Sequence, residues 1–165
     1  IYNELGSNFC CVIPTNLYGI NDNFSIQDGH VIPSLIHKFY LAKESNSNVT
    51  LFGDGKALRQ FLYVNDLARF MISLAFEYDG KDTFIISPDE TDEISILSLA
   101  KLIAKYMNFK GKIILNKHYP SGQYKKTASN KKLKTHFPNF KFTHIDEGLK
   151  DTIKWFIRNY PNIRK

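Results

Sequence analysis

Residues 11–64 read CVIPTNLYGINDNFSIQDGHVIPSLIHKFYLAKESNSNVTLFGDGKALRQFLYV, and they carry most of the information about the fold. The apolar run from Cys11 to Ile13 is typical of a fully buried strand in a parallel sheet. This strand ends at Pro14, where a polar loop begins. Because ligands of open α/β sheets bind at the carboxyl ends of strands, we expect the loop to border a binding site.

Strands and helices alternate along the rest of the chain without strict repetition. This mixture favours the α/β class: the end of a doubly wound, Rossmann-like sheet plus a small α/β lobe. The expected elements are strands at 9–13, 83–87 and 112–115, a hairpin formed by 49–52 and 60–63, and helices at about 32–43, from Asn65, from Ser95 and from about Asp146 to Pro161.

The composition is that of a globular domain with its own core, since 43% of the 165 residues are hydrophobic and 23% are charged. Cys10 and Cys11 are adjacent and fit neither a disulfide framework nor a metal site, so we expect both to be packing residues in a reducing compartment. We find no membrane span and no signal peptide, which favours a cytoplasmic location. Residues 1–6 read as the last turn of a helix, which suggests a fragment of a longer protein.

Basic residues gather in one part of the chain. Between Ile94 and Ile145 there is no Asp or Glu, and this segment holds 11 of the 22 basic residues. Lysines alternate there with aromatic residues, so a nucleic-acid-binding module is one alternative. It has no recognisable nucleic-acid motif, and we expect no nucleic-acid partner.

Several motifs of this chain occur together in one enzyme family. PTNLYG, NDNF, DGHVIPSLIHKF, FGDG and LRQFLYVNDLA, followed by PSGQYKKTASNKKL and DTIKWF, resemble the carboxyl-terminal half of the GDP-L-fucose synthases, which are extended short-chain dehydrogenases. The resemblance covers nearly the whole chain. It implies a homodimeric enzyme that converts GDP-4-keto-6-deoxy-mannose to GDP-L-fucose by 3,5-epimerisation and NADPH-dependent 4-keto reduction.

The resemblance also implies which parts of the family's fold this chain holds. Residues 1–24 correspond to the last part of the dinucleotide-binding domain, and residues 25–165 mainly to the substrate lobe, with segments that return to the sheet. The glycine-rich phosphate turn, the tyrosine–lysine pair and the cysteine base of the family all lie upstream of Ile1. We therefore expect this chain to be inactive alone.

His30 is the predicted catalytic residue. Epimerisation beside a ketone needs one group that removes a proton from carbon and another that delivers one, and an imidazole can do either. A lone histidine before a helix is more often a capping or surface residue. The resemblance of DGHVIP to the family's epimerase motif implies that His30 is the acid and that it also contacts the nicotinamide end of the cofactor.

The resemblance assigns the other binding residues as well. Pro14, Thr15, Asn16 and Leu17 are implied to line the NADPH cofactor, although Asn16 could instead cap its own loop. The implied contacts with the GDP-sugar are Lys38, Phe52, Arg59, Ser121 and Lys126, with Lys125 beside the last of these. We expect His30, Arg59 and the lysine pair to face one cleft.

Each substrate residue has a structural alternative. Lys38 could be a solvated helix residue, Phe52 part of a hairpin core, and Arg59 a charge on a strand edge. Phe52 also stands where the family usually has tryptophan, and Ser121 where it commonly has aspartate. These departures leave open a different nucleotide-sugar epimerase or dehydratase.

Overall fold

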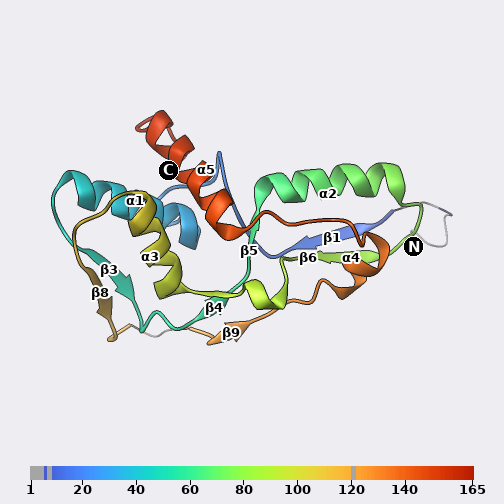
Figure 1. The fold of residues 1–165 in the computed structure, drawn as a ribbon, viewed down its shortest axis with the longest axis horizontal. Helices are drawn as coiled ribbons and strands as arrows, with labels where there is room; N and C mark the ends of the chain where they lie inside the picture. The colour runs from blue at the N-terminus through green and yellow to red at the C-terminus, as the bar shows by residue number, and fades with distance from the viewer. Residues whose placement is uncertain (1–5, 7–8, 120–121) are drawn as a thin grey trace.

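The structure is a computed structural model that describes Gly6, residues 9–119 and residues 122–165 (Figure 1). Its helices are α1 (Val31–Glu44), α2 (Val64–Glu77), α3 (Ile96–Tyr106), α4 (Lys131–His136) and α5 (Ile145–Asn159), with a short 3-10 turn, η1, at Glu90–Asp92. Its strands are β1 (Cys11–Pro14), β2 (Asn16–Tyr18), β3 (Val49–Phe52), β4 (Leu58–Arg59), β5 (Phe61–Tyr63), β6 (Thr83–Ile86), β7 (Ile94–Ser95), β8 (Ile113–Asn116) and β9 (Lys125–Lys126).

Most strand pairs are parallel and join segments that are distant in sequence. β1 pairs with β6, β2 with β5, and β3 with β8, all in parallel. β4 pairs in parallel with β9 and antiparallel with β7. Parallel pairing of strands connected through helices is the arrangement of doubly wound folds, so the predicted α/β class is confirmed.

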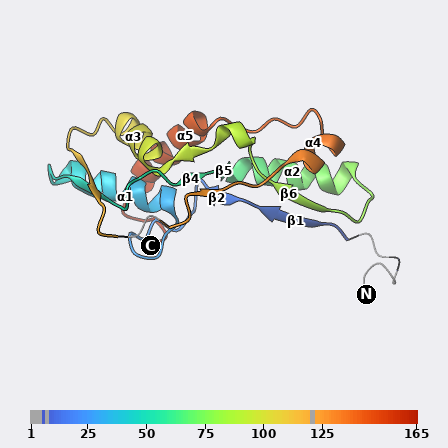
Figure 2. The same ribbon diagram turned by 90° about the horizontal axis from the view of Figure 1, so that it is seen from below.

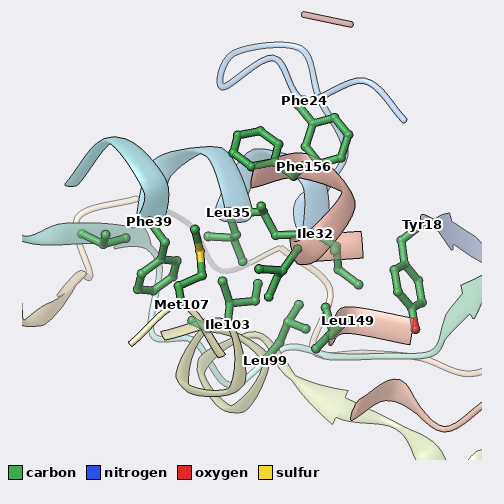
Figure 3. Close-up of a cluster of buried hydrophobic side chains, with 14 of the residues drawn as sticks. Tyr18, Phe24, Ile32, Leu35, Phe39, Leu99, Ile103, Met107, Leu149 and Phe156 are labelled. Carbon is green, nitrogen blue, oxygen red and sulfur yellow. The ribbon is translucent and has the colours of Figure 1, made fainter. Parts of the chain in front are cut away.

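Two apolar cores lie at opposite ends of an elongated molecule. One is built around β1 and β6, with α2 and α4 on the same face of this strand pair (Figure 2). The other lies among α1, α3 and α5, where Leu35, Ile103 and Phe156 meet (Figure 3). β2 and β5 pair in parallel between the two ends (Figure 1). Their last residues, Tyr18 and Tyr63, belong to the second core, whereas Leu62 belongs to the first.

The prediction that Cys11 to Ile13 is fully buried is wrong. Successive strand residues face opposite sides. Val12 packs into the core beneath α2, whereas Cys11 is exposed and the Ile13 side chain is 54% exposed. Within the described part of the chain, α2 and α4 cover only one face of β1, so half of the strand's side chains stay accessible.

The predicted hairpin is also wrong. Residues 49–52 pair with β8 and residues 61–63 pair with β2, and the Gly53–Gly55 turn connects them without pairing them. Both glycines have positive φ angles, 82° and 71°, as the expected turn requires. The alternation of apolar residues suits a strand with any partner, so it could not identify β8 and β2 as the partners.

The predicted helices are present, but the residue predicted to cap one of them, α2, does not do so. Ser95 caps α3, because its Oγ accepts a hydrogen bond from the Ser98 N–H at 3.1 Å. Asn65 does not cap α2, which already begins at Val64, directly after β5. No helix in the described residues is long and apolar enough to cross a bilayer.

Candidate functional site

A cavity of about 750 Å³ lies beside the carboxyl end of β1. It is formed by four parts of the chain: the junction of β1 and β2, the start of α1 with the two residues before it, the first residue of β5, and the end of β9 with the two residues after it. Its lining residues are Pro14, Thr15, Asn16, Leu17, Gly29, His30, Val31, Ile32, Phe61, Lys126, Thr127 and Ala128. The cavity therefore brings together the predicted catalytic residue, the predicted cofactor loop and one predicted substrate lysine.

Hydrogen bonds to neighbouring strands fix the loop after β1. The Thr15 N–H donates to the Ile86 carbonyl at 3.0 Å, at the end of β6. The Asn16 amide Nδ2 donates to the Gln60 carbonyl at 2.9 Å, just before β5. Because this amide bonds to another strand, the alternative that Asn16 caps its own loop is wrong.

Gln60 is a structural residue of the site that the sequence analysis missed. Its side chain is fully buried, and its Nε2 donates to the carbonyls of Pro88 at 2.9 Å and Ala128 at 3.1 Å. Its Oε1 accepts from the Ala128 N–H at 2.7 Å. The wall at Thr127 and Ala128 is thus tied to β5. A glutamine at the head of an apolar strand was the only sequence signal.

His30 stands at the residue before α1. Its side chain makes no capping hydrogen bond to the helix, so the capping alternative is wrong. The side chain is 75% exposed, and its Nδ1 lies 3.4 Å from Oδ1 of Asp22. An imidazole in this position is open to the cavity and has a carboxylate as its neighbour.

Lys38 and Phe52 line a second, shallower cavity of about 340 Å³ between α1 and β3. The Lys38 Nζ lies 5.1 Å from the centre of the Phe52 ring, a cation–π contact. Partial burial lowers the pKa of Lys38. The ring of Phe52 is 57% exposed and lies 4.5 Å from that of Tyr119, so the alternative that Phe52 is hairpin core is wrong.

Arg59 and Lys126 lie beside each other on β4 and β9, where their Cα atoms are register partners. The guanidinium donates to the carbonyls of Leu58 at 2.6 Å and Gln123 at 2.9 Å. Lys126 lines the larger cavity, whereas Lys125 forms an ion pair with Glu93 at 3.2 Å. Two of the expected cations, His30 and Lys126, therefore share the cavity, and Arg59 is adjacent through the strand pair.

The basic segment is partly neutralised by acidic residues from outside it. Lys132 pairs with Asp82 at 2.9 Å, and Lys134 bonds to Asp89 at 2.7 Å. Lys125 pairs with Glu93 in the same way. These pairs use lysines that a nucleic-acid-binding surface would need to keep available. The remaining predicted residue, Ser121, lies outside the described residues.

Comparison with known proteins agrees with this geometry. Residues 1–86 match the model of the NAD dependent epimerase/dehydratase family. The chain belongs to this family. In doubly wound sheets in general, ligands bind at the carboxyl ends of the strands, and the larger cavity lies at the carboxyl end of β1.

Individual proteins that resemble this chain have more specific names than the family model. A GDP-L-fucose synthase of Dictyostelium discoideum is 50% identical over 165 residues, which are 99% of this chain and 52% of that protein. The crystal structure of a GDP-L-fucose synthetase from Naegleria fowleri bound to NADP superimposes with a TM-score of 0.95 at 40% identity, over 99% of this chain and 53% of that one. A GDP-L-colitose synthase of Yersinia pseudotuberculosis is 32% identical over 91% of this chain and 48% of that protein.

The chain spans about half the length of the curated relatives it matches. Its resemblance to the GDP-L-fucose synthases extends over almost all of its own residues. The sequence motifs and the comparisons thus point to the same group of enzymes, and this chain matches about half the length of each relative.

Proposed function

We propose that this chain is the substrate-binding half of a GDP-L-fucose synthase, which converts GDP-4-keto-6-deoxy-D-mannose to GDP-L-fucose by 3,5-epimerisation and NADPH-dependent 4-keto reduction. The observation that carries the proposal is the cavity in which His30, the loop after β1 and Lys126 meet. Residues 1–24 belong to the cofactor-binding part and residues 25–165 mainly to the substrate lobe. The pairing of β6 with β1 supports a return of the chain to the sheet.

His30 acts as the acid in the epimerisation. The 4-keto group makes the hydrogens on the neighbouring carbons acidic, so a base can remove one and leave an enolate. The His30 Nε2 then gives its proton to that carbon from the opposite face, and the imidazole regains a proton from water. The exposure of the His30 side chain at the N-terminus of α1 supports this role, because a ligand in the cavity can reach it.

Positive charge near the reacting carbons stabilises the enolate and the diphosphate. Lys126 lines the cavity, and Arg59 lies next to it on β4. A guanidinium binds phosphate oxygens through paired hydrogen bonds, whereas an ammonium contributes a compact charge. Phe52, with Lys38 above it, offers an aromatic surface for the nucleobase. Ser121 completes the predicted substrate contacts.

The loop after β1 suits the nicotinamide end of NADPH. Thr15 and Asn16 are held by carbonyls of neighbouring strands, so Pro14 to Leu17 present a fixed wall beside His30. When bound, the cofactor supplies the hydride that reduces the 4-keto group. The chain's contribution is to hold the ring and the sugar in one cavity and to exclude water from between them.

The location, oligomeric state and partners of the protein are part of the same proposal. The enzyme works in the cytoplasm as a homodimer, and its partners are the GDP-sugar and NADPH. A nucleic-acid partner is disfavoured because lysines of the basic segment are paired with Asp82, Asp89 and Glu93.

Calorimetric titration of this chain with GDP and with UDP tests the substrate class. We expect GDP to bind and UDP to bind more weakly. Arg59→Met removes charge-assisted hydrogen bonds and should weaken GDP binding by about tenfold or more, whereas Arg158→Met, at an exposed position on α5, should not. Preference for UDP would favour a different nucleotide-sugar enzyme, and no binding of either nucleotide would contradict the proposal.

A further inference from the structure

The loop of residues 22–30, which leads to His30, is closed by its own hydrogen bonds. The Asn23 Oδ1 accepts from the Ser25 N–H at 3.0 Å, and the Ser25 Oγ accepts from the Asp28 N–H at 3.2 Å. The Gly29 N–H donates to the Ser25 carbonyl at 3.0 Å. The two ends of the loop are therefore held near each other without any ligand.

Phe24 anchors this loop to the rest of the molecule. Its N–H donates to the Arg164 carbonyl at 2.9 Å, and its carbonyl lies 2.8 Å from Nδ1 of His37, which must carry the proton in that bond. Its ring is fully buried and contacts Phe156 at 4.9 Å and Trp155 at 5.8 Å between ring centres (Figure 3). The loop is thus fixed to the rest of the molecule near its start.

Gly29 allows the loop to close as tightly as it does. A Cβ atom at this position would lie 2.3 Å from the Ser25 carbonyl oxygen and 2.5 Å from that of Asn23. Both distances are far below contact, and both neighbours are backbone atoms that cannot turn away. This close approach is what brings His30 back beside the start of the loop.

Asp22 is the residue that His30 meets there. Its Oδ1 lies 3.4 Å from Nδ1 of the imidazole and also accepts the Asn23 N–H at 2.7 Å. The Asp22 side chain is only 15% exposed, whereas that of His30 is 75% exposed. A carboxylate that is held by the backbone on one side and faces an exposed ring on the other is a fixed acceptor for that ring.

We propose that Asp22 is the positioning residue for His30: it accepts a hydrogen bond from the Nδ1–H group, selects this tautomer, and leaves Nε2 directed at the cavity. The bond that one ring nitrogen makes determines which form the other takes. In the protonated ring, the same carboxylate stabilises the cation whose Nε2–H is given to the substrate. The inference rests on the proposed role of His30 as the acid.

The test is the ¹⁵N NMR spectrum of the histidine rings in this chain at about pH 8.5, where an ordinary imidazole is neutral. In the wild type we expect His30 to carry its proton on Nδ1, as His37 does. Asp22→Ala should shift His30 toward the Nε2–H form that free histidine prefers and leave His37 unchanged. Asp28→Ala removes an exposed carboxylate of the same loop and should change neither.

Two results would overturn the inference: a wild-type His30 in the Nε2–H form, or an Asp22→Ala variant in which His30 keeps its tautomer while His37 is unchanged. If Asp22→Ala also alters His37, the loop has moved. Asp22→Asn, which keeps an acceptor oxygen, must then restore the Nδ1–H form of His30, and failure to do so refutes the role.

A second measurement separates this inference from the proposed function. NADP⁺ and GDP-L-fucose are added to the wild-type chain, and the Nε2 resonance of His30 is followed. A shift supports the catalytic role of His30. No shift, together with the expected Nδ1–H tautomer, counts against the proposed function while the contact between Asp22 and His30 stands.

Discussion

Buried polar side chains hold the cavity walls at the scale of single residues. Gln60 bonds to segments that are 28 and 68 residues away in sequence, at Pro88 and Ala128. Asp22 and Tyr119 likewise acquire their partners only when the chain folds. Motifs in the sequence could identify His30 and the loop from Pro14 to Leu17, because local residue order carries them. No local pattern shows a hydrogen bond between residues so far apart.

Replacing Gln60 by leucine should destabilise the fold. The change removes the partner of the Ala128 N–H and of the Ala128 carbonyl, and it leaves the Pro88 carbonyl with the Ser87 hydroxyl as its donor. Each buried group that loses its partner costs about 1–3 kcal/mol. We expect the free energy of unfolding, measured in urea, to fall by roughly 2–5 kcal/mol. Gln27→Leu changes an exposed glutamine and serves as the control. Equal effects of the two substitutions would contradict the role given to Gln60.

Lys38 should make the stability depend on pH on the alkaline side. Burial lowers the folded pKa of Lys38, so its charged form opposes folding at any pH below that folded value. This cost disappears as the pH rises to the ordinary lysine value of 10.5. Lys38→Met should therefore raise the thermal midpoint at neutral pH, with a gain that shrinks in alkali. Lys43→Met, an exposed change on the same helix, should show no such trend.

The elements are specified by the sequence more reliably than their partners. Helices α1, α3 and α5 follow from the spacing of apolar residues, and Ser95 marks the start of α3 as predicted. The strands at 49–52 and 61–63 also exist, but they pair with β8 and β2. The apolar pattern shows that alternate residues of β3 and all three residues of β5 are buried. It does not show which strand pairs with either of them. The prediction that Cys11 is buried was wrong for a related reason, since the burial of a strand residue depends on what covers its face of β1.

Asp89 connects the end of β6 to α4, and this connection should weaken in acid. Lys134 and Asn130 lower the pKa of Asp89 by hydrogen bonding to it. The pKa of Asp89 in the folded protein is below its ordinary value of 3.8, so the ionised carboxylate stabilises the fold above pH 3.8. This stabilisation is lost as the pH falls through the folded pKa of Asp89. Asp89→Asn should lower the melting temperature at neutral pH and match the wild type once the pH is well below the folded pKa of Asp89. Asp79→Asn, at an exposed position, is the control, and a loss that persists in strong acid would argue against the pairing.

At the scale of the whole molecule, one cavity gathers residues from the start, middle and end of the chain. The loop after β1, the head of α1 and the segment after β9 meet there because β1, β5 and β9 each pair with a strand that is distant in sequence. The likeness to the GDP-L-fucose synthases extends over nearly all of this chain, so it includes the segments that line the cavity. Lys38 and Phe52 do not line this cavity. They line a second cavity together.

This chain alone should not catalyse the reaction. By the resemblance, none of these 165 residues corresponds to the phosphate-binding turn, the tyrosine–lysine pair or the base of the proposed reaction. We therefore expect no oxidation of NADPH, followed by its absorbance, when the chain is mixed with GDP-4-keto-6-deoxy-mannose. Turnover above a blank without protein would show that the residues of this half suffice, which contradicts the division of roles.

Mapping the binding of GDP-L-fucose by backbone amide NMR tests the central claim most directly. If His30 and Lys126 border one sugar-nucleotide site, the amide signals of residues 15–17, His30 and 126–128 should shift together during the titration, and those of α4 should stay in place. Shifts confined to α4 and the rest of the basic segment, or no shifts at all, would contradict the account.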